Sequence, residues 1–281
     1  KLGRHAQALA SHEAAIARDP HLAEAHASRG DVLSMLQRPV EALASYDSAI
    51  ALRPDYPYEY SNRGNVLQML GRFEEALASH DKAIALKPDY AEAHNNRGNT
   101  LRELNRLEAA LASYDQALSS KPEYADALSN RGLVLRDLMR YEEEARNYEA
   151  LLSINPGYDY SLGNLVNAKL YSCDWTNYDK RAGQLADCVR ANRRSSLPFI
   201  LLAVSDSAKD QLLCARTHVE DKYPASATPL WNNHRYHHDK IRIAYLSADF
   251  REHAVAYLMA GLFEKHDRKR FETTAIAFSP Y

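Results

Sequence analysis

The chain has 281 residues, of which 46% are hydrophobic and 26% charged, and its net charge at neutral pH is −2. This is the composition of an ordinary globular protein. A net charge near zero gives no overall field that would attract nucleic acid or an anionic membrane, and no apolar run approaches the roughly 20 residues of a membrane-spanning helix. We therefore expect neither nucleic acid nor a membrane as a partner.

Prolines recur along the first part of the chain with a fixed spacing of 34 residues. They are Pro20, Pro54, Pro88, Pro122 and Pro156. This period is typical of tetratricopeptide (TPR) repeats, each of which is a helix, a turn and a second helix. With the proline at position 32, the full repeats are 23–56, 57–90, 91–124 and 125–158. Residues 1–158, which begin with a partial repeat, are therefore predicted to form an α-solenoid with a concave surface for another polypeptide.

Small residues and rings recur at fixed positions within the repeat. Position 8 is glycine in every full repeat, and positions 20 and 27 are alanine in the first three. Small residues let paired helices approach closely, and a ring at position 24 is expected to fill the remaining gap. The rings are Tyr46, His80, Tyr114 and Tyr148. Glu144 replaces the alanine of position 20 in the last full repeat, so we expect a local slip or a loosened contact there.

Position 6 of the first helix carries a polar side chain throughout. The residues are Ser28, Asn62, Asn96, Asn130 and, beyond the last proline, Asn164. A primary amide both donates and accepts hydrogen bonds, so it can pair with the backbone of an extended peptide. Helices about 10 Å apart would bring one amide to roughly every third peptide residue. We predict that Asn62, Asn96, Asn130 and Asn164 bind an extended peptide; the alternative is a merely solvated helix face.

Position 7 holds an arginine in every full repeat. These are Arg29, Arg63, Arg97 and Arg131. Pairing with nearby acids inside the solenoid is favoured over anion binding. A chaperone-type clamp for peptide carboxylates would need lysines beside the asparagines, but positions 2 and 5 carry none. We do not expect a groove of that kind.

Residues 159–239 are predicted to cap the solenoid and to lead into a different structure. One more first helix is expected over about 159–171, followed by helical segments within 177–219. The polar, histidine-rich stretch 228–240 is typical of a linker, and a metal site there is not expected because cysteine ligands are missing. The three cysteines of the chain are an odd number without metal-ligand spacing. They suit a reducing compartment, so a cytoplasmic location is expected.

The sequence period changes again at residue 240. A β-branched run over 240–247, a helical stretch over 254–266 and a second strand over 272–279 predict a parallel βαβ unit. The loop between the first strand and the helix leaves the carboxyl end of a parallel strand, where open α/β sheets bind their ligands. It lacks a glycine-rich phosphate motif, so dinucleotide binding at this turn is not expected. Two strands and one helix cannot bury a core, so further strands are expected.

Two motifs carry a more specific resemblance. Ser172-Cys-Asp-Trp-Thr-Asn-Tyr-Asp-Lys-Arg181 resembles the junction segment of the protein O-GlcNAc transferases. Ile241-Arg-Ile-Ala-Tyr-Leu-Ser-Ala-Asp-Phe250, with His253 after it, resembles the first strand and active-site loop of the same family. Residues 271–280 resemble its second strand. The likeness follows the chain in order, from TPR superhelix to junction to the first part of a catalytic region.

This resemblance implies a glycosyltransferase of the GT-B fold that moves a sugar from a nucleotide donor to Ser or Thr of proteins. Residues 240–281 would begin its N-terminal Rossmann-like half, and the TPR groove would hold the acceptor through the asparagines of position 6. His253 would be the candidate general base or a cleft residue, with Asp249 and Tyr257 as further cleft residues. Tyr257 replaces a second histidine of the animal enzymes, which brings the motif closer to Spindly-type O-fucosyltransferases and bacterial relatives.

The donor sugar therefore stays open between UDP-GlcNAc and GDP-fucose. Most donor contacts in such enzymes come from a C-terminal half that this sequence does not contain. No cofactor is expected beyond the nucleotide sugar, and the chain by itself is expected to be inactive. It begins with Lys1 inside a repeat, so we expect it to be part of a longer protein. The alternative is a non-catalytic TPR scaffold for protein–protein interactions.

Overall fold

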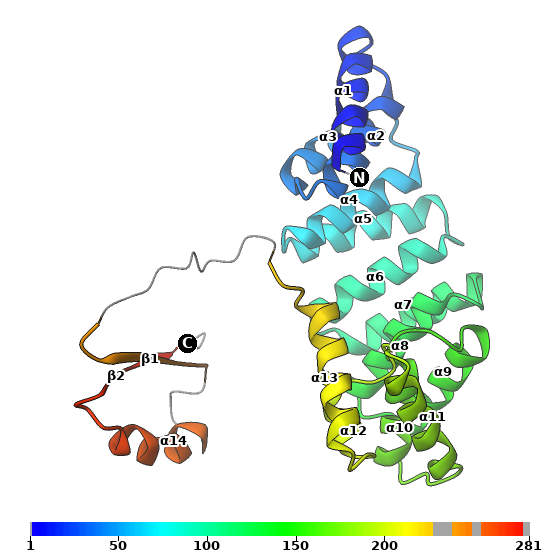
Figure 1. Cartoon of the computed structure of the whole chain (residues 1–281). Coiled ribbons are helices and arrows are strands. Elements are labelled where there is room, and N and C mark those ends of the chain that lie inside the picture. Colours follow the sequence, from blue (N-terminus) through cyan, green and yellow to red (C-terminus); the bar gives the residue numbers. More distant parts are fainter. Residues whose placement is uncertain (1, 227–237, 249–253, 278–281) are drawn as a thin grey trace. The chain divides into compact units, whose positions relative to one another are not determined.

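The computed structural model describes residues 2–226, 238–248 and 254–277 (Figure 1). Contacts divide the chain into two units, Lys1–Pro224 and Ala225–Tyr281. The first unit is helical, and the second contains two strands and one helix. In the part of the chain that the structure describes, no helix has both the length and the apolar character needed to cross a membrane.

The predicted TPR solenoid is confirmed, because pairs of helices recur with the 34-residue spacing of the prolines. The first helices are α2 (Ala23–Met35), α4 (Pro57–Met69), α6 (Ala91–Glu103) and α8 (Ala125–Asp137). The second helices are α3 (Pro39–Leu52), α5 (Phe73–Leu86), α7 (Leu107–Ser120) and α9 (Tyr141–Ile154). The second helix of the partial repeat is α1 (Leu2–Arg18).

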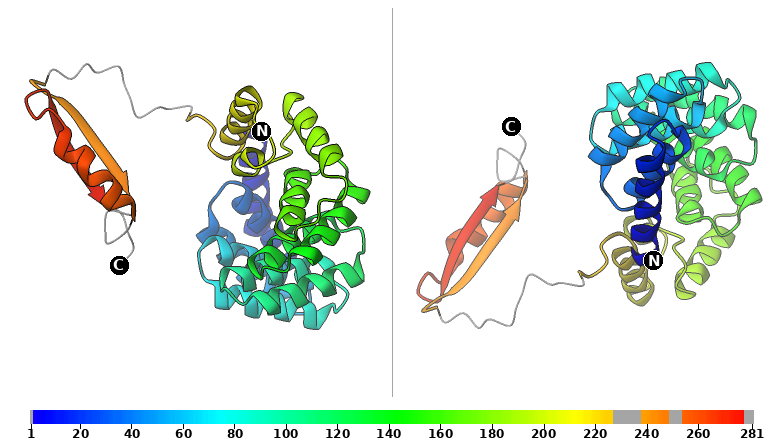
Figure 2. Two further views of the ribbon diagram at one scale, coloured as in Figure 1. Left: turned by 90° about the horizontal axis from the view of Figure 1, so that it is seen from below. Right: turned by 90° about the horizontal axis from the view of Figure 1, so that it is seen from above.

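The repeats curve with their first helices on the inner side. α2 contacts α4, α4 contacts α6 and α6 contacts α8, whereas no comparable contact joins neighbouring second helices within residues 2–158. Closer spacing along one side of a stack bends the stack toward that side. The first helices therefore line the concave surface, and the repeats of this unit turn around a common axis (Figure 2).

The core of each repeat is a ring packed on a glycine, as predicted. A Cβ atom added to Gly98 would lie 2.6 Å from Cε1 of Tyr114, and one added to Gly132 would lie 2.6 Å from Cζ of Tyr148. Both tyrosines are fully buried. The ring thus occupies the space that a larger residue at position 8 would need.

The expectation that the helix register slips locally at Glu144 is wrong. α9 begins 34 residues after α7, like every other second helix, and Glu144 is fully buried within it. Arg136 on α8 donates to Oε1 of Glu144 from Nε at 2.9 Å and from Nη2 at 2.6 Å. An arginine eight residues earlier thus satisfies part of the carboxylate, and the helix keeps its register. Burial raises the pKa of Glu144 above its ordinary value.

Among the position-24 rings of the four full repeats, His80 is the one that is not a tyrosine. The hydroxyl of Tyr46 donates to Asp31 at 2.6 Å, and that of Tyr114 donates to Asn99 at 2.7 Å. Asp31 and Asn99 both stand at position 9 of their repeats. The repeat that contains His80 has Asn65 at this position. His80 is fully buried, and neither of its ring nitrogens has a partner in the described structure. Burial lowers its pKa to about 4.

We expect His80→Tyr to stabilise the solenoid and to reduce its sensitivity to acid. The new hydroxyl would bond to Asn65, which contributes about 0.5–1.5 kcal/mol. Below pH about 6.5 the unfolded wild-type chain binds a proton at His80 that the folded chain does not bind, so stability falls as the pH drops toward 4. Thermal unfolding at pH 7.5 and 5 measures both effects. If acidification lowers the melting temperature of the wild type and the variant equally, the predicted difference in acid sensitivity is wrong.

Four further helices cover the C-terminal end of the solenoid. They are α10 (Ser161–Tyr171), α11 (Tyr178–Arg190), α12 (Pro198–Leu202) and α13 (Ala208–Lys222). α10 packs on α9 as the one additional first helix that the sequence predicts. Val166 on α10 joins Leu185, Val189, Leu201 and Cys214 in a separate core. This core covers an apolar helix face that the next repeat would otherwise cover.

The second unit is the predicted βαβ unit. β1 (Ile241–Ser247) and β2 (Phe271–Ala277) are parallel, with Ile241 opposite Phe271. They are connected by α14 (Ala254–Lys265). Leu246 is 63% exposed and Ile276 is 44% exposed. Two strands and one helix thus leave apolar side chains uncovered within this unit.

Candidate peptide-binding groove

Three of the four asparagines of position 6 lie half-buried on the concave surface. Each donates a hydrogen bond from Nδ2 to the preceding first helix. The bonds are Asn62 to Asp31 Oδ1 at 3.1 Å, Asn96 to Ser61 Oγ at 3.4 Å and Asn130 to Asn95 Oδ1 at 3.0 Å. These amides are therefore oriented by neighbouring repeats and are not simply solvated. A primary amide has two N–H donors and an acceptor, so one such bond leaves capacity for a ligand.

Asn164 differs from the other members of the series. Its side chain is buried, with only 7% exposed. Nδ2 donates to the hydroxyl of Tyr148 at 3.2 Å, and Oδ1 is buried without a hydrogen-bond partner among the described residues. The amide thus sits between α9 and α10. The structure brings Asn62, Asn96 and Asn130 together on one surface, but Asn164 has little surface left for a ligand.

A second polar series was missed by the sequence reasoning. Position 9, one turn beyond the asparagines, carries Asp31, Asn65 and Asn99. These residues line two hollows of the concave face, which share Asn65. The signal was present in the sequence, because these residues have the same 34-residue spacing as position 6. Residues three apart in a helix share a face, so positions 6 and 9 form one continuous polar surface.

The arginines of position 7 pair within the solenoid, as predicted. Each bridges the second helix of the preceding repeat and the second helix of its own. Arg63, for example, lies 2.6 Å from Asp47 and donates to Ser79 Oγ at 2.6 Å. Arg97 and Arg131 reach Asp81 and Asp115 in the same way. Because these guanidinium groups already have acidic partners, they add no free positive charge to the groove.

The same acidic position ties the junction segment to the solenoid. Glu149 stands where the three preceding full repeats have aspartate, but the next first helix has no arginine in register. Its carboxylate instead lies 3.2 Å from Nζ of Lys169 and 2.9 Å from Nη2 of Arg181. Lys169 also bonds Asp174 at 2.5 Å. Arg181, the last residue of the junction motif, thus holds α11 against the last full repeat.

The structure describes only part of the predicted catalytic loop. Asp249 and His253 lie outside the described residues. Tyr257 is on α14 and is 71% exposed. The loop begins after Ser247, at the carboxyl end of β1. Parallel α/β sheets bind their ligands at that end.

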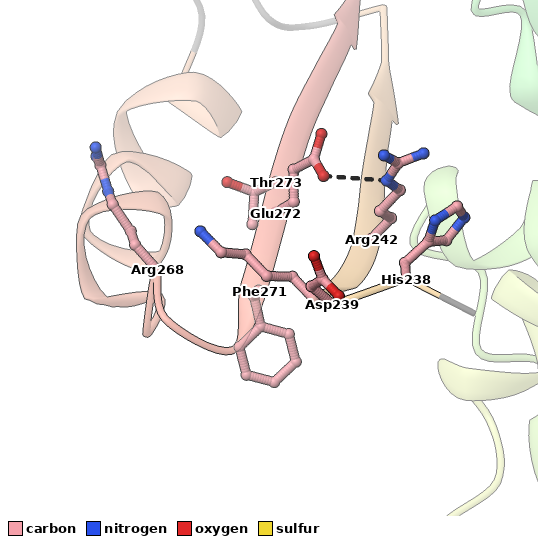
Figure 3. A pocket seen from close by; sticks show the side chains of 8 residues that line it. His238, Asp239, Arg242, Arg268, Phe271, Glu272 and Thr273 are labelled. Atoms are coloured by element: carbon pink, nitrogen blue, oxygen red, sulfur yellow. Dashed lines mark hydrogen bonds and ion pairs between the residues drawn. The ribbon is translucent and has the colours of Figure 1, made fainter. Parts of the chain in front are cut away.

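A hollow in the second unit lies at the opposite end of the strands (Figure 3). It is lined by residues at the start of β1 and β2, including His238, Asp239 and Thr273. Arg242 donates from Nε to Glu272 at 3.0 Å across the two strands. We assign no function to this hollow, because the amino ends of parallel strands are not where such sheets bind ligands.

Comparison with known proteins supports the repeat architecture. A TPR repeat family model matches residues 40–71, 69–101 and 98–138. The solved structure of YrrB, described as a TPR protein with an unusual peptide-binding site, is 18% identical with a TM-score of 0.53, covering 73% of this chain and 97% of YrrB. PilF of Pseudomonas aeruginosa is 20% identical with a TM-score of 0.58, covering 66% of this chain and 84% of PilF. Identities this low show the fold alone.

One curated protein adds a more specific similarity. The UDP-N-acetylglucosamine--peptide N-acetylglucosaminyltransferase of Caenorhabditis elegans is 30% identical over 124 residues. The match covers 38% of this chain and 10% of the enzyme. The matched part of the chain therefore spans about a tenth of that relative's length.

Proposed function

We propose that this chain, a solenoid of TPR repeats, is the acceptor-binding part and the beginning of the catalytic region of a protein O-glycosyltransferase. The observation that carries the proposal is the series of oriented amides on the concave surface, Asn62, Asn96 and Asn130. A groove of this kind holds a polypeptide by its backbone, and an enzyme that modifies Ser or Thr in many sequences needs such tolerance.

Two further observations support the enzymatic part. The similarity to the Caenorhabditis elegans transferase is 30% over 124 residues. The second unit contains two parallel strands joined by a helix, and the sequence after β1 contains the motif with Asp249 and His253. In this proposal His253 accepts the proton of the attacking hydroxyl, and Asp249 and Tyr257 lie in the same cleft. The nucleotide sugar is held mainly by residues beyond this chain.

The test is sugar transfer by the full-length protein. Purified protein is incubated with labelled UDP-GlcNAc or GDP-fucose and an unstructured Ser/Thr-containing polypeptide, and incorporation of label is measured. We expect incorporation from one of the two donors, and none from residues 1–281 alone. If the full-length protein incorporates neither sugar, the enzymatic proposal is wrong.

The second candidate function is a non-catalytic scaffold. The observation that favours it is that the described groove lies within the first unit alone, and YrrB, a protein of similar fold, is described as having a peptide-binding site. A scaffold would bind polypeptides with the same dependence on the asparagines but would transfer no sugar. The transfer assay therefore separates the two functions.

We expect Asn62→Ala, Asn96→Ala and Asn130→Ala, introduced together, to weaken binding of an unstructured peptide. Each lost amide removes about 0.5–1.5 kcal/mol. Asn164→Ala should instead lower the melting temperature, because this amide is buried against Tyr148. Fluorescence anisotropy with a labelled peptide measures the first effect, and circular dichroism measures the second. Unchanged peptide affinity in a folded triple variant would leave the three amides with a role between repeats only.

A further inference from the structure

The concave surface is not uniformly polar. Met35 and Met69 stand 34 residues apart, at the same position of two successive first helices, and are 63% and 45% exposed. The next two repeats carry Glu103 and Asp137 at that position. Exposed apolar side chains of this series are therefore confined to the N-terminal half of the groove.

Each methionine lines one of the two hollows described above. The first hollow is lined in part by Asp31, Met35, Asn62 and Asn65. The second is lined in part by Asn65, Met69, Phe73, Asn96 and Asn99. Both therefore combine a methionine with an amide of position 6 and a polar residue of position 9. Such a hollow can bind a peptide backbone and an apolar side chain together, and methionine adapts to side chains of different shape.

The spacing of the hollows favours one peptide conformation. Neighbouring helices in contact lie about 8–10 Å apart. A polyproline II helix has three residues per turn and rises about 3.1 Å per residue, so residues i and i+3 point the same way about 9 Å apart. A β-strand would send residues i and i+3 to opposite faces. Polyproline II also has no internal hydrogen bonds, so its backbone is available to the asparagines.

The charge of the hollows favours a basic peptide. Asp31 lines the first and Glu103 lines the second, and neither Lys nor Arg is among the residues that line them. Asp31 accepts hydrogen bonds from Tyr46 and Asn62, which carry no charge, so these bonds leave its negative charge in place. Glu103 is partly offset by Arg102, whose Nη2 lies 3.7 Å away, so Asp31 supplies the larger share of the negative charge. Like charges placed together oppose binding, so an acidic segment is disfavoured here.

We propose that the N-terminal half of the groove selects polypeptide segments in the polyproline II conformation that carry apolar side chains at i and i+3 beside a basic residue. This inference rests on the proposed function of the groove as a polypeptide site. It adds a side-chain preference to an amide series that by itself distinguishes little between sequences.

The experiment measures the affinity of residues 1–281 for short fluorescein-labelled peptides by anisotropy. The first peptide has Leu at i and i+3 beside Arg. The second has the same composition with Leu at i and i+2, and the third has Glu in place of Arg. We expect the first to bind about tenfold more tightly than the second, a difference of about 1.4 kcal/mol, and the third to bind more weakly than the first.

Protein variants locate the preference. Met35→Gln combined with Met69→Gln should abolish the advantage of the i, i+3 peptide. Met139→Gln is the matched control, because Met139 is 72% exposed and lines neither hollow; it should bind like wild type. Circular dichroism confirms that the variants fold.

Equal binding of the first two peptides overturns the inference, as does an unchanged preference in the double methionine variant. In either case the groove can still be a polypeptide site: replacing Asn62, Asn96 and Asn130 would then lower the affinity of all the peptides. If no peptide binds to the wild-type chain, both the inference and the proposed groove function are wrong.

Discussion

His253→Ala is expected to lower the turnover of the full-length protein by about 10²–10⁴-fold, the usual contribution of a general base. His253 follows Ser247, the last residue of β1, by six positions. The loop therefore leaves the strand end at which parallel sheets bind ligands. In the proposed reaction a serine or threonine hydroxyl must lose its proton as it attacks the sugar, and imidazole is the side chain best matched to that transfer near neutral pH.

The Michaelis constants separate this role from a binding role. If His253 acts in the transition state, kcat falls while the constants for donor and acceptor stay nearly unchanged. His21→Ala is the control, because His21 is an exposed residue of the solenoid before α2; its activity should equal that of wild type. Near-normal turnover in a folded His253→Ala protein would contradict the assignment, and the enzymatic proposal would then rest on sequence similarity alone.

Gly98→Ala is expected to destabilise the solenoid by up to about 2 kcal/mol, because overpacking a core costs about 1–3 kcal/mol and the helix preference of alanine offsets part of that cost. The added Cβ would lie 2.6 Å from Cε1 of Tyr114. That ring cannot move aside cheaply, because it is fully buried and its hydroxyl bonds to Asn99 at 2.7 Å. Alanine favours a helix by about 1 kcal/mol over glycine, but this gain is smaller than the steric cost.

Gly183→Ala is the matched control for this prediction. Gly183 lies inside α11, and an added Cβ would meet no atom within 4 Å. The same substitution should therefore stabilise the protein by up to about 1 kcal/mol. Thermal unfolding followed by circular dichroism compares the two variants. A melting temperature that rises for both would show that the glycine–tyrosine contact is not tight.

The period of the sequence predicts the fold of the repeats closely, because each anchor residue has a physical role that recurs. Proline ends the second helix, and glycine admits the ring. The turn inside each repeat is less visible. Gln37, Gly71, Asn105 and Met139 all adopt positive φ at the same position, but only one is glycine, so residue type does not reveal the left-handed turn.

Single departures from the repeat were harder to predict. Glu144 was expected to disturb α9, but Arg136 on the neighbouring helix α8 donates two hydrogen bonds to its carboxylate. Asn164 shares its position with the other asparagines, but it is buried and donates to the hydroxyl of Tyr148 on α9. Burial at such a position depends on the neighbouring element, which the local sequence does not specify. The motif around His253 came from family resemblance, and its geometry lies outside the described residues.

The most direct test compares donor hydrolysis with acceptor transfer in the full-length protein carrying Asn62→Ala, Asn96→Ala and Asn130→Ala. If the solenoid delivers the acceptor to a separate catalytic region, transfer to an unstructured polypeptide should fall while hydrolysis of the nucleotide sugar stays at the wild-type rate. Equal transfer by variant and wild type, with both folded, would contradict the claim that this groove holds the acceptor.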